Sequence, residues 1–221
     1  MSTGTHEQRN SLLSKLGWAL AGIVATGLGG IILAAAVLEF GLFNVAASTA
    51  HLPEVTWFVH RVMIHSVQHR ARGISAPASV APSEVAAGYC EYRAHCQMCH
   101  GGPGVARDKW ANGVNPPPPY LVDSRARWTT NQLYWIVSNG VKMTAMPAWS
   151  ASMSNRQIWS VVSFVETAPK LSAGTYLKWG KSPGCPSASD VVAALGPAGT
   201  PANLPPSLAN SRGKPALLPR R

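Results

Sequence analysis

The chain has 221 residues, a formal net charge of +10 and a sequence pI of ≈ 9.9. A balance this basic suits either an acidic protein surface or nucleic acid. Nucleic acid is excluded, because no recognition motif for it is present and a long uncharged run near the N-terminus predicts export. Residues 84–181 carry ten basic and five acidic side chains, a net charge of +5 that would steer association with an acidic partner protein.

Residues 16–38 contain no charged side chain, and these 23 positions exceed the roughly 20 that a helix needs to span a bilayer. Arg9 and Lys15 precede the run and Glu39 follows it. The positive-inside rule then places the N-terminus in the cytoplasm and everything after residue 43 on the other side. We therefore expect a single membrane anchor.

A cleavable secretory signal is the alternative to an anchor, with Ser48-Thr49-Ala50 as its small-residue cleavage site. Signal h-regions run to about 7–15 residues, and the apolar run here is longer, so the anchor is favoured. Either alternative leaves the rest of the chain outside the cytoplasm.

Residues 44–83 contain an apolar stripe at helical spacing that begins after Pro53. The stripe predicts an amphipathic helix that lies on the membrane or against a partner subunit. His60, His65 and His69 fall in the same stretch, and a solvated face is favoured for them because no carboxylate cluster accompanies them. The residues of the stripe are Val55, Phe58, Val59, Val62 and Met63.

The pentapeptide at residues 96–100, Cys-Gln-Met-Cys-His, is typical of covalent c-type haem attachment. Cys96 and Cys99 would form thioethers with the two haem vinyl groups, and His100 would then lie under the iron. A thioredoxin-type dithiol is disfavoured because no βαβ pattern surrounds the motif. A structural zinc site is disfavoured because only three ligands cluster here.

A second axial ligand is expected from the segment Asn139–Trp149, which contains two methionines. A thioether opposite the histidine raises the reduction potential of a haem iron. Met146 is favoured because Pro147 pushes it out of the α region onto an extended loop. Met143 is expected to fill a gap in the core.

Two helices should flank these ligands. Gly88, Tyr92 and Cys96 recur every four residues on one helical face, and glycine there would let a second helix approach closely. The second helix is predicted after a cap at Ser154, Asn155 and Gln157. Its apolar face consists of Ile158, Val161, Val162 and Val165.

The C-terminal residues 182–221 are rich in Pro, Ala, Gly and Ser and contain no aromatic residue, so we expect an extended or disordered tail without core residues. Cys185 lies in this tail. A disulfide between Cys90 and Cys185 and two unpaired thiols are both open at this point.

Residues 84–181 resemble a class I, mitochondrial-type monohaem cytochrome c domain. The features that carry this resemblance are Gly88 and Tyr92, the haem motif with Gly101, the loop that ends in Pro119-Tyr120-Leu121, Met146-Pro147-Ala148-Trp149, and the last helix with Ile158, Trp159, Val162 and Phe164. The resemblance implies an all-α domain around one covalent haem c bound by Cys96, Cys99, His100 and Met146. It also implies that a carbonyl of the Pro119–Leu121 loop accepts the proton of the proximal histidine; Tyr120 stands where the family usually has asparagine.

We therefore expect an all-α protein with a transmembrane anchor (1–43), an amphipathic helix and linker (44–83), a cytochrome c domain (84–181) and a Pro/Ala-rich tail (182–221). It is expected to be a single-pass protein of a bacterial inner membrane with its haem domain in the periplasm. No general base or nucleophile accompanies the haem motif, so electron transfer rather than catalysis is expected. Its partners would be redox proteins with acidic docking surfaces. The protein would act either as a tethered carrier between a quinol-oxidising complex and a terminal oxidase or as a fixed subunit of a larger respiratory complex.

Overall fold

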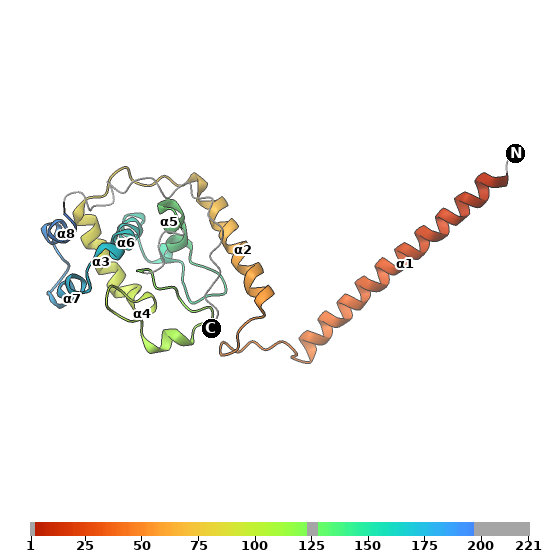
Figure 1. The fold of residues 1–221 in the computed structure, drawn as a ribbon, viewed down its shortest axis with the longest axis horizontal. Coiled ribbons are helices and arrows are strands. Elements are labelled where there is room, and N and C mark those ends of the chain that lie inside the picture. The colour runs from red at the N-terminus through yellow and green to blue at the C-terminus, as the bar shows by residue number, and fades with distance from the viewer. Residues whose placement is uncertain (1–2, 123–127, 197–221) are drawn as a thin grey trace. The chain divides into compact units, whose positions relative to one another are not determined.

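The computed structural model describes residues 3–122 and 128–196 of the chain. Within these ranges it contains helices and no β-strand, which confirms the all-α prediction (Figure 1). The chain divides into two compact units, Met1–Thr49 and Ala50–Arg221. The first unit contains α1 (Thr3–Glu39). The second contains α2 (Pro53–Arg70), η1 (Ala71–Gly73), α3 (Pro82–His95), α4 (Gln97–His100), η2 (Lys109–Gly113), α5 (Thr130–Asn139), η3 (Trp149–Ala151), α6 (Asn155–Thr167), η4 (Ala168–Lys170), α7 (Ala173–Lys181) and α8 (Ala188–Leu195).

The first unit is dominated by the single long helix α1. Its segment Leu12–Glu39 is 28 residues long and apolar enough to cross a membrane, and none of its most apolar window is buried within the protein. At a rise of about 1.5 Å per residue the segment is longer than the ~30 Å hydrocarbon core of a bilayer. The helix therefore fits a membrane anchor.

Helices α3 and α6 cross at Gly88 and form the frame of the second unit. A Cβ atom at Gly88 would lie 1.8 Å from the carbonyl oxygen of Ser160 and 3.0 Å from Cβ of Phe164. Gln157 Nε2 also donates a 2.8 Å hydrogen bond from α6 to Glu91 Oε1 on α3. The prediction that glycine at position 88 permits a close approach of two helices is confirmed.

Helix α6 begins at the predicted cap. The Ser154 hydroxyl accepts from the backbone N–H of Gln157, and the Gln157 side chain accepts from the backbone N–H of Ser154. This reciprocal capping satisfies two backbone donors that the first turn would otherwise leave unpaired. Ile158, Val161 and Val162 are buried along one face, as their spacing predicts.

The C-terminal segment is partly folded, so the expectation of an extended or disordered tail without core residues is wrong for 188–195. Helix α8 forms there, and Val191 is fully buried in the cluster that contains Val85 and Tyr89 of α3. Cys90 and Cys185 form a disulfide that links α3 to the segment before α8. A composition rich in Pro, Ala, Gly and Ser does not prevent a short apolar helix such as 188–195 from packing on the core, next to a disulfide that links the segment to α3. Residues 197–221 lie outside the described residues.

We expect Val191→Ala to lower the free energy of unfolding by about 2 kcal/mol, because the substitution leaves a cavity in a packed core. Val192→Ala is the matched control: the neighbouring side chain is 37% exposed, and its truncation should change stability by no more than about 0.5 kcal/mol. Denaturant unfolding of both holoproteins measures the difference. Equal effects would mean that α8 does not pack on α3 in solution.

Candidate functional site: the attachment motif and its facing loops

The attachment motif lies at the junction of α3 and α4. Cys96 caps the C-terminal end of α3, and its carbonyl accepts hydrogen bonds from the backbone N–H groups of Cys99 (3.1 Å) and His100 (2.9 Å). This tight turn places both thiols and the imidazole within five consecutive residues, and no disulfide joins Cys96 to Cys99. Both sulfurs therefore remain available for other bonds.

The environment of the two thiols does not resemble that of a redox dithiol. Burial raises the pKa of Cys96 to about 12, and the nearby Cys99 and Glu91 add to the effect. Burial, assisted by Asp108, also raises the pKa of Cys99 above its usual value. Thiol–disulfide catalysts depend on a lowered thiol pKa. The two cysteines are thus poorly suited to disulfide exchange, which agrees with the sequence-based argument against that function.

His100 is held in one tautomer. Its Nδ1 lies 2.8 Å from the carbonyl oxygen of Pro119, and because a carbonyl can only accept, Nδ1–H is the donor. Burial lowers the pKa of His100, partly offset by this hydrogen bond, so the ring is neutral near pH 7. The Nε2 lone pair is therefore free to bind a metal, and the hydrogen bond at Nδ1 orients the ring for that purpose.

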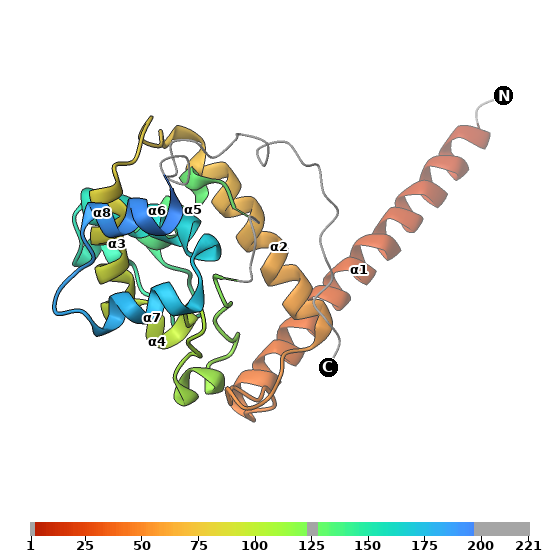
Figure 2. The ribbon, with the colours of Figure 1, turned by 60° about the vertical axis from the view of Figure 1, so that its left-hand side comes forward.

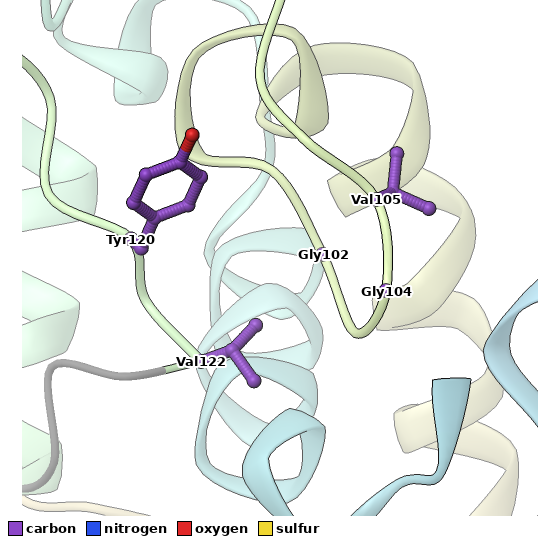
Figure 3. Close-up of a pocket in the computed structure, with 5 residues that line it drawn as sticks. All are labelled: Gly102, Gly104, Val105, Tyr120 and Val122. Atoms are coloured by element: carbon purple, nitrogen blue, oxygen red, sulfur yellow. The ribbon is translucent and has the colours of Figure 1, made fainter.

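The loop that supplies this carbonyl is fixed by Tyr120. The Arg107 guanidinium lies 3.9 Å from the centre of the Tyr120 ring, and a Cβ at Gly101 would lie 2.9 Å from Cε1 of the same ring. Figure 3 shows the turn at Gly102–Val105 facing Tyr120 and Val122 across a cavity of ≈ 280 Å³. Tyrosine in place of the family's usual asparagine thus leaves the Pro119 carbonyl within reach of the histidine. Leu121, the last residue of the predicted loop set, packs against the main core.

Met146 lies in a turn closed by hydrogen bonds, and its side chain faces the core. The Val141 N–H donates to the Met146 carbonyl (3.2 Å), and the Thr144 hydroxyl accepts from the Met146 N–H (3.1 Å). Met146 is partly buried and packs against the cluster that contains Val137 and Ile158, and Cys96 packs against this same cluster. The structure therefore brings Met146 and the attachment motif to one cluster from segments 50 positions apart in the sequence.

The expectation that Met143 fills a gap in the core is wrong. Its side chain is 88% exposed, and its backbone has a φ of 59°, in the left-handed region. The Thr144 hydroxyl donates a 2.7 Å hydrogen bond to the Val141 carbonyl, which tightens the turn and leaves Met143 at its tip. Of the two methionines, only Met146 contacts the core.

Two contacts from α7 support the attachment motif and were not predicted from the sequence. The Tyr176 hydroxyl donates to Gln97 Oε1 at 2.5 Å, and a Cβ at Gly102 would lie 2.7 Å from the Tyr176 ring. Tyr176 and Trp179 also pack edge-on against Tyr89 of α3. An aromatic pair three residues apart after a serine cap at Ser172 was the available signal for this helix.

The residues present fit a covalently bound haem. Two unpaired thiols, an oriented imidazole and a partly buried thioether form the donor set that a c-type haem uses. In addition, Arg107 Nε is buried and has no hydrogen-bond partner within the described residues. A buried donor of this kind calls for an acceptor, and the propionate carboxylates of a haem are acceptors. A zinc ion or a disulfide would leave Arg107 Nε unsatisfied.

We expect Cys96→Ala/Cys99→Ala to release its haem into acidified acetone, because no thioether bond remains. The wild-type protein should retain its haem under the same extraction, and Cys99→Ala should retain at most a single thioether. Absorbance of the extract and the intact mass of the protein measure both outcomes. Full retention of haem by the double variant would refute covalent attachment at these residues.

Residues 83–165 match the family model described as "Cytochrome C oxidase, cbb3-type, subunit III". The matched segment begins at α3 and ends within α6, so it contains the attachment motif, the Pro119 carbonyl and Met146. No curated protein matches the chain at a significant level.

Proposed function

Residues 83–165 form a class I c-type cytochrome domain, a kind of domain that binds haem c covalently and transfers electrons, and from this premise we propose that the whole chain is a membrane-tethered electron carrier. In this proposal it connects a quinol-oxidising complex with a terminal oxidase. The observation that carries the proposal is the neutral, oriented His100 beside two unpaired thiols in a chain that begins with a helix able to span a membrane.

We assign Cys96 and Cys99 to covalent attachment and His100 and Met146 to the axial positions. The bound haem supplies a one-electron iron couple. The Pro119 carbonyl keeps Nδ1 of His100 protonated, so that Nε2 stays directed at the metal. Met146 is partly buried and packs against the cluster that contains Val137 and Ile158, and its thioether as a ligand would favour the reduced state of the iron.

We place the protein in a bacterial inner membrane with the haem domain in the periplasm. Arg9 and Lys15 precede the apolar part of α1, and the positive-inside rule assigns that end to the cytoplasm. The disulfide between Cys90 and Cys185 supports this orientation, because disulfides persist in oxidising compartments such as the periplasm.

A fixed subunit of a larger respiratory complex is the second candidate. The name of the matching family model refers to an oxidase subunit, and the first half of α2 exposes apolar side chains that a neighbouring subunit could cover. The net charge of +5 on residues 84–181 instead favours the tethered carrier, because a basic surface accelerates repeated encounters with an acidic partner.

Mild detergent extraction distinguishes the two candidates. A tethered carrier should elute as a single haem-staining protein in its own detergent micelle, and its oxidation by added acidic redox partner should slow steeply as salt is raised. Co-elution with other subunits at constant ratio, together with a salt-independent rate of haem oxidation in membranes, would establish the fixed subunit instead.

A further inference from the structure

Helix α2 is divided along its length into a packed half and an exposed half. Its second half lies beside α5, where Val67 is fully buried and Met63 and Ile64 are partly buried (Figure 2). The helix predicted from the apolar stripe therefore exists, but most of that stripe does not face this contact. Residues 53–62 leave five large apolar side chains exposed, which we call the α2 patch: Val55, Trp57, Phe58, Val59 and Val62.

The segment that precedes α2 in the sequence is also apolar. Residues 40–52, which connect α1 with α2, contain no Asp, Glu, Lys or Arg. Five further large apolar side chains in this connector are exposed: Phe40, Leu42, Phe43, Val45 and Leu52. Exposed large apolar side chains in this number are unfavourable in water, and they indicate a contact with a membrane or another protein.

The position of the α2 patch in the chain favours the membrane. The connector follows directly on Glu39, the end of the segment that can cross a bilayer, and its thirteen residues (40–52) reach at most about 45 Å when fully extended. Aromatic residues such as Trp57 are enriched at the boundary between lipid headgroups and acyl chains. Arg61, Arg70 and Arg72 outnumber the single acid Glu54 along α2 and η1, which suits anionic headgroups.

We propose that the connector and the α2 patch lie in the interfacial region of the bilayer that α1 crosses. The packing of the second half of α2 on α5 then holds the haem domain close to the membrane surface. The inference rests on α1 remaining in the membrane, which is part of the proposed function. The occupant of the α2 patch is thus the lipid interface rather than a second protein.

A fluorescent label at residue 56 tests the proposal in the full-length holoprotein. The exposed Thr56 lies within the α2 patch and is not one of its apolar side chains, and the exposed Gln68 lies on the packed half of the same helix. With Cys90 bonded to Cys185 and the motif cysteines carrying haem, Thr56→Cys or Gln68→Cys would provide the one free thiol. The labelled proteins are reconstituted in phosphatidylethanolamine–phosphatidylglycerol vesicles with and without nitroxide-bearing lipid.

We expect nitroxide lipid to quench the label at residue 56 roughly twofold or more relative to the label at residue 68, since an interfacial helix buries one part of its surface among acyl chains. For each label, the fluorescence with nitroxide lipid is divided by the fluorescence in nitroxide-free vesicles. This ratio cancels the constant quenching by haem. Adding Trp57→Ser and Phe58→Ser to the Thr56→Cys protein should abolish this excess.

Equal quenching at the two positions would overturn the proposal, as would quenching at residue 56 that persists in the Trp57→Ser/Phe58→Ser protein. Absence of quenching together with loss of a co-purifying subunit from the double variant would assign the α2 patch to a protein interface, and would also overturn it. The intact mass of the purified chain reports separately on α1. A chain that begins after Ala50 would refute the anchor without any use of the label.

Discussion

Met146→His is expected to abolish the far-red charge-transfer band of the ferric protein and to lower its midpoint potential by more than about 120 mV. The band arises from a thioether sulfur on low-spin ferric haem, and a nitrogen donor in its place no longer favours the reduced iron. At about 59 mV per tenfold change, this shift displaces the one-electron equilibrium a hundredfold. Absorbance spectroscopy of the oxidised protein and a redox titration measure the two effects.

Met143→Leu is the matched control for the axial ligand. Its side chain is exposed at the tip of the turn that Thr144 closes, so the substitution should keep the band and change stability by no more than about 0.5 kcal/mol. If the band vanishes in the Met143 variant and survives in the Met146 variant, the assignment of the axial ligand is reversed.

Gly88→Ala is expected to destabilise the haem domain by about 3 kcal/mol or more, because the added methyl group cannot be accommodated where α3 crosses α6. The new Cβ would lie 1.8 Å from the Ser160 carbonyl oxygen and 2.4 Å from its carbon, and both atoms belong to backbone that cannot rotate away. Relief requires the two helices to separate, which also disturbs Tyr92 and Phe164. Denaturant unfolding followed by far-ultraviolet circular dichroism measures the loss.

Gly73→Ala makes the same chemical change at a place with room for it. A Cβ at Gly73 meets no atom within 4 Å, so the free energy of unfolding of this variant should lie within about 0.5 kcal/mol of the wild-type value. If the Gly88 variant cannot be purified with haem in an amount sufficient for unfolding, the yields of haem-bearing protein from the Gly88 and Gly73 variants are compared instead. Similar stability and yield for the two variants would contradict the close crossing of α3 and α6.

The local features of this protein were determined by its sequence. The apolar run of α1, the reciprocal cap of α6 and the spacing of Ile158, Val161 and Val162 all depend on residues within a few turns of one another. Helical periodicity and capping are local properties, so they can be recognised without knowledge of the fold. The attachment motif is local for the same reason, because its cysteines and histidine need only one turn of chain to act together.

Other features were decided by the tertiary structure. Whether Met143 or Met146 faces the core depends on how the turn between them closes, and the burial of Val191 depends on the packing of α8 against α3. The disulfide beside α8 joins cysteines 95 positions apart. The carbonyl that orients His100 comes from Pro119, 19 positions away, and Tyr176 reaches Gln97 across 79 positions. These contacts join segments that are distant in the sequence, and their geometry arises only when α3, α6 and α7 pack together, because no local pattern encodes the distance between two separate segments.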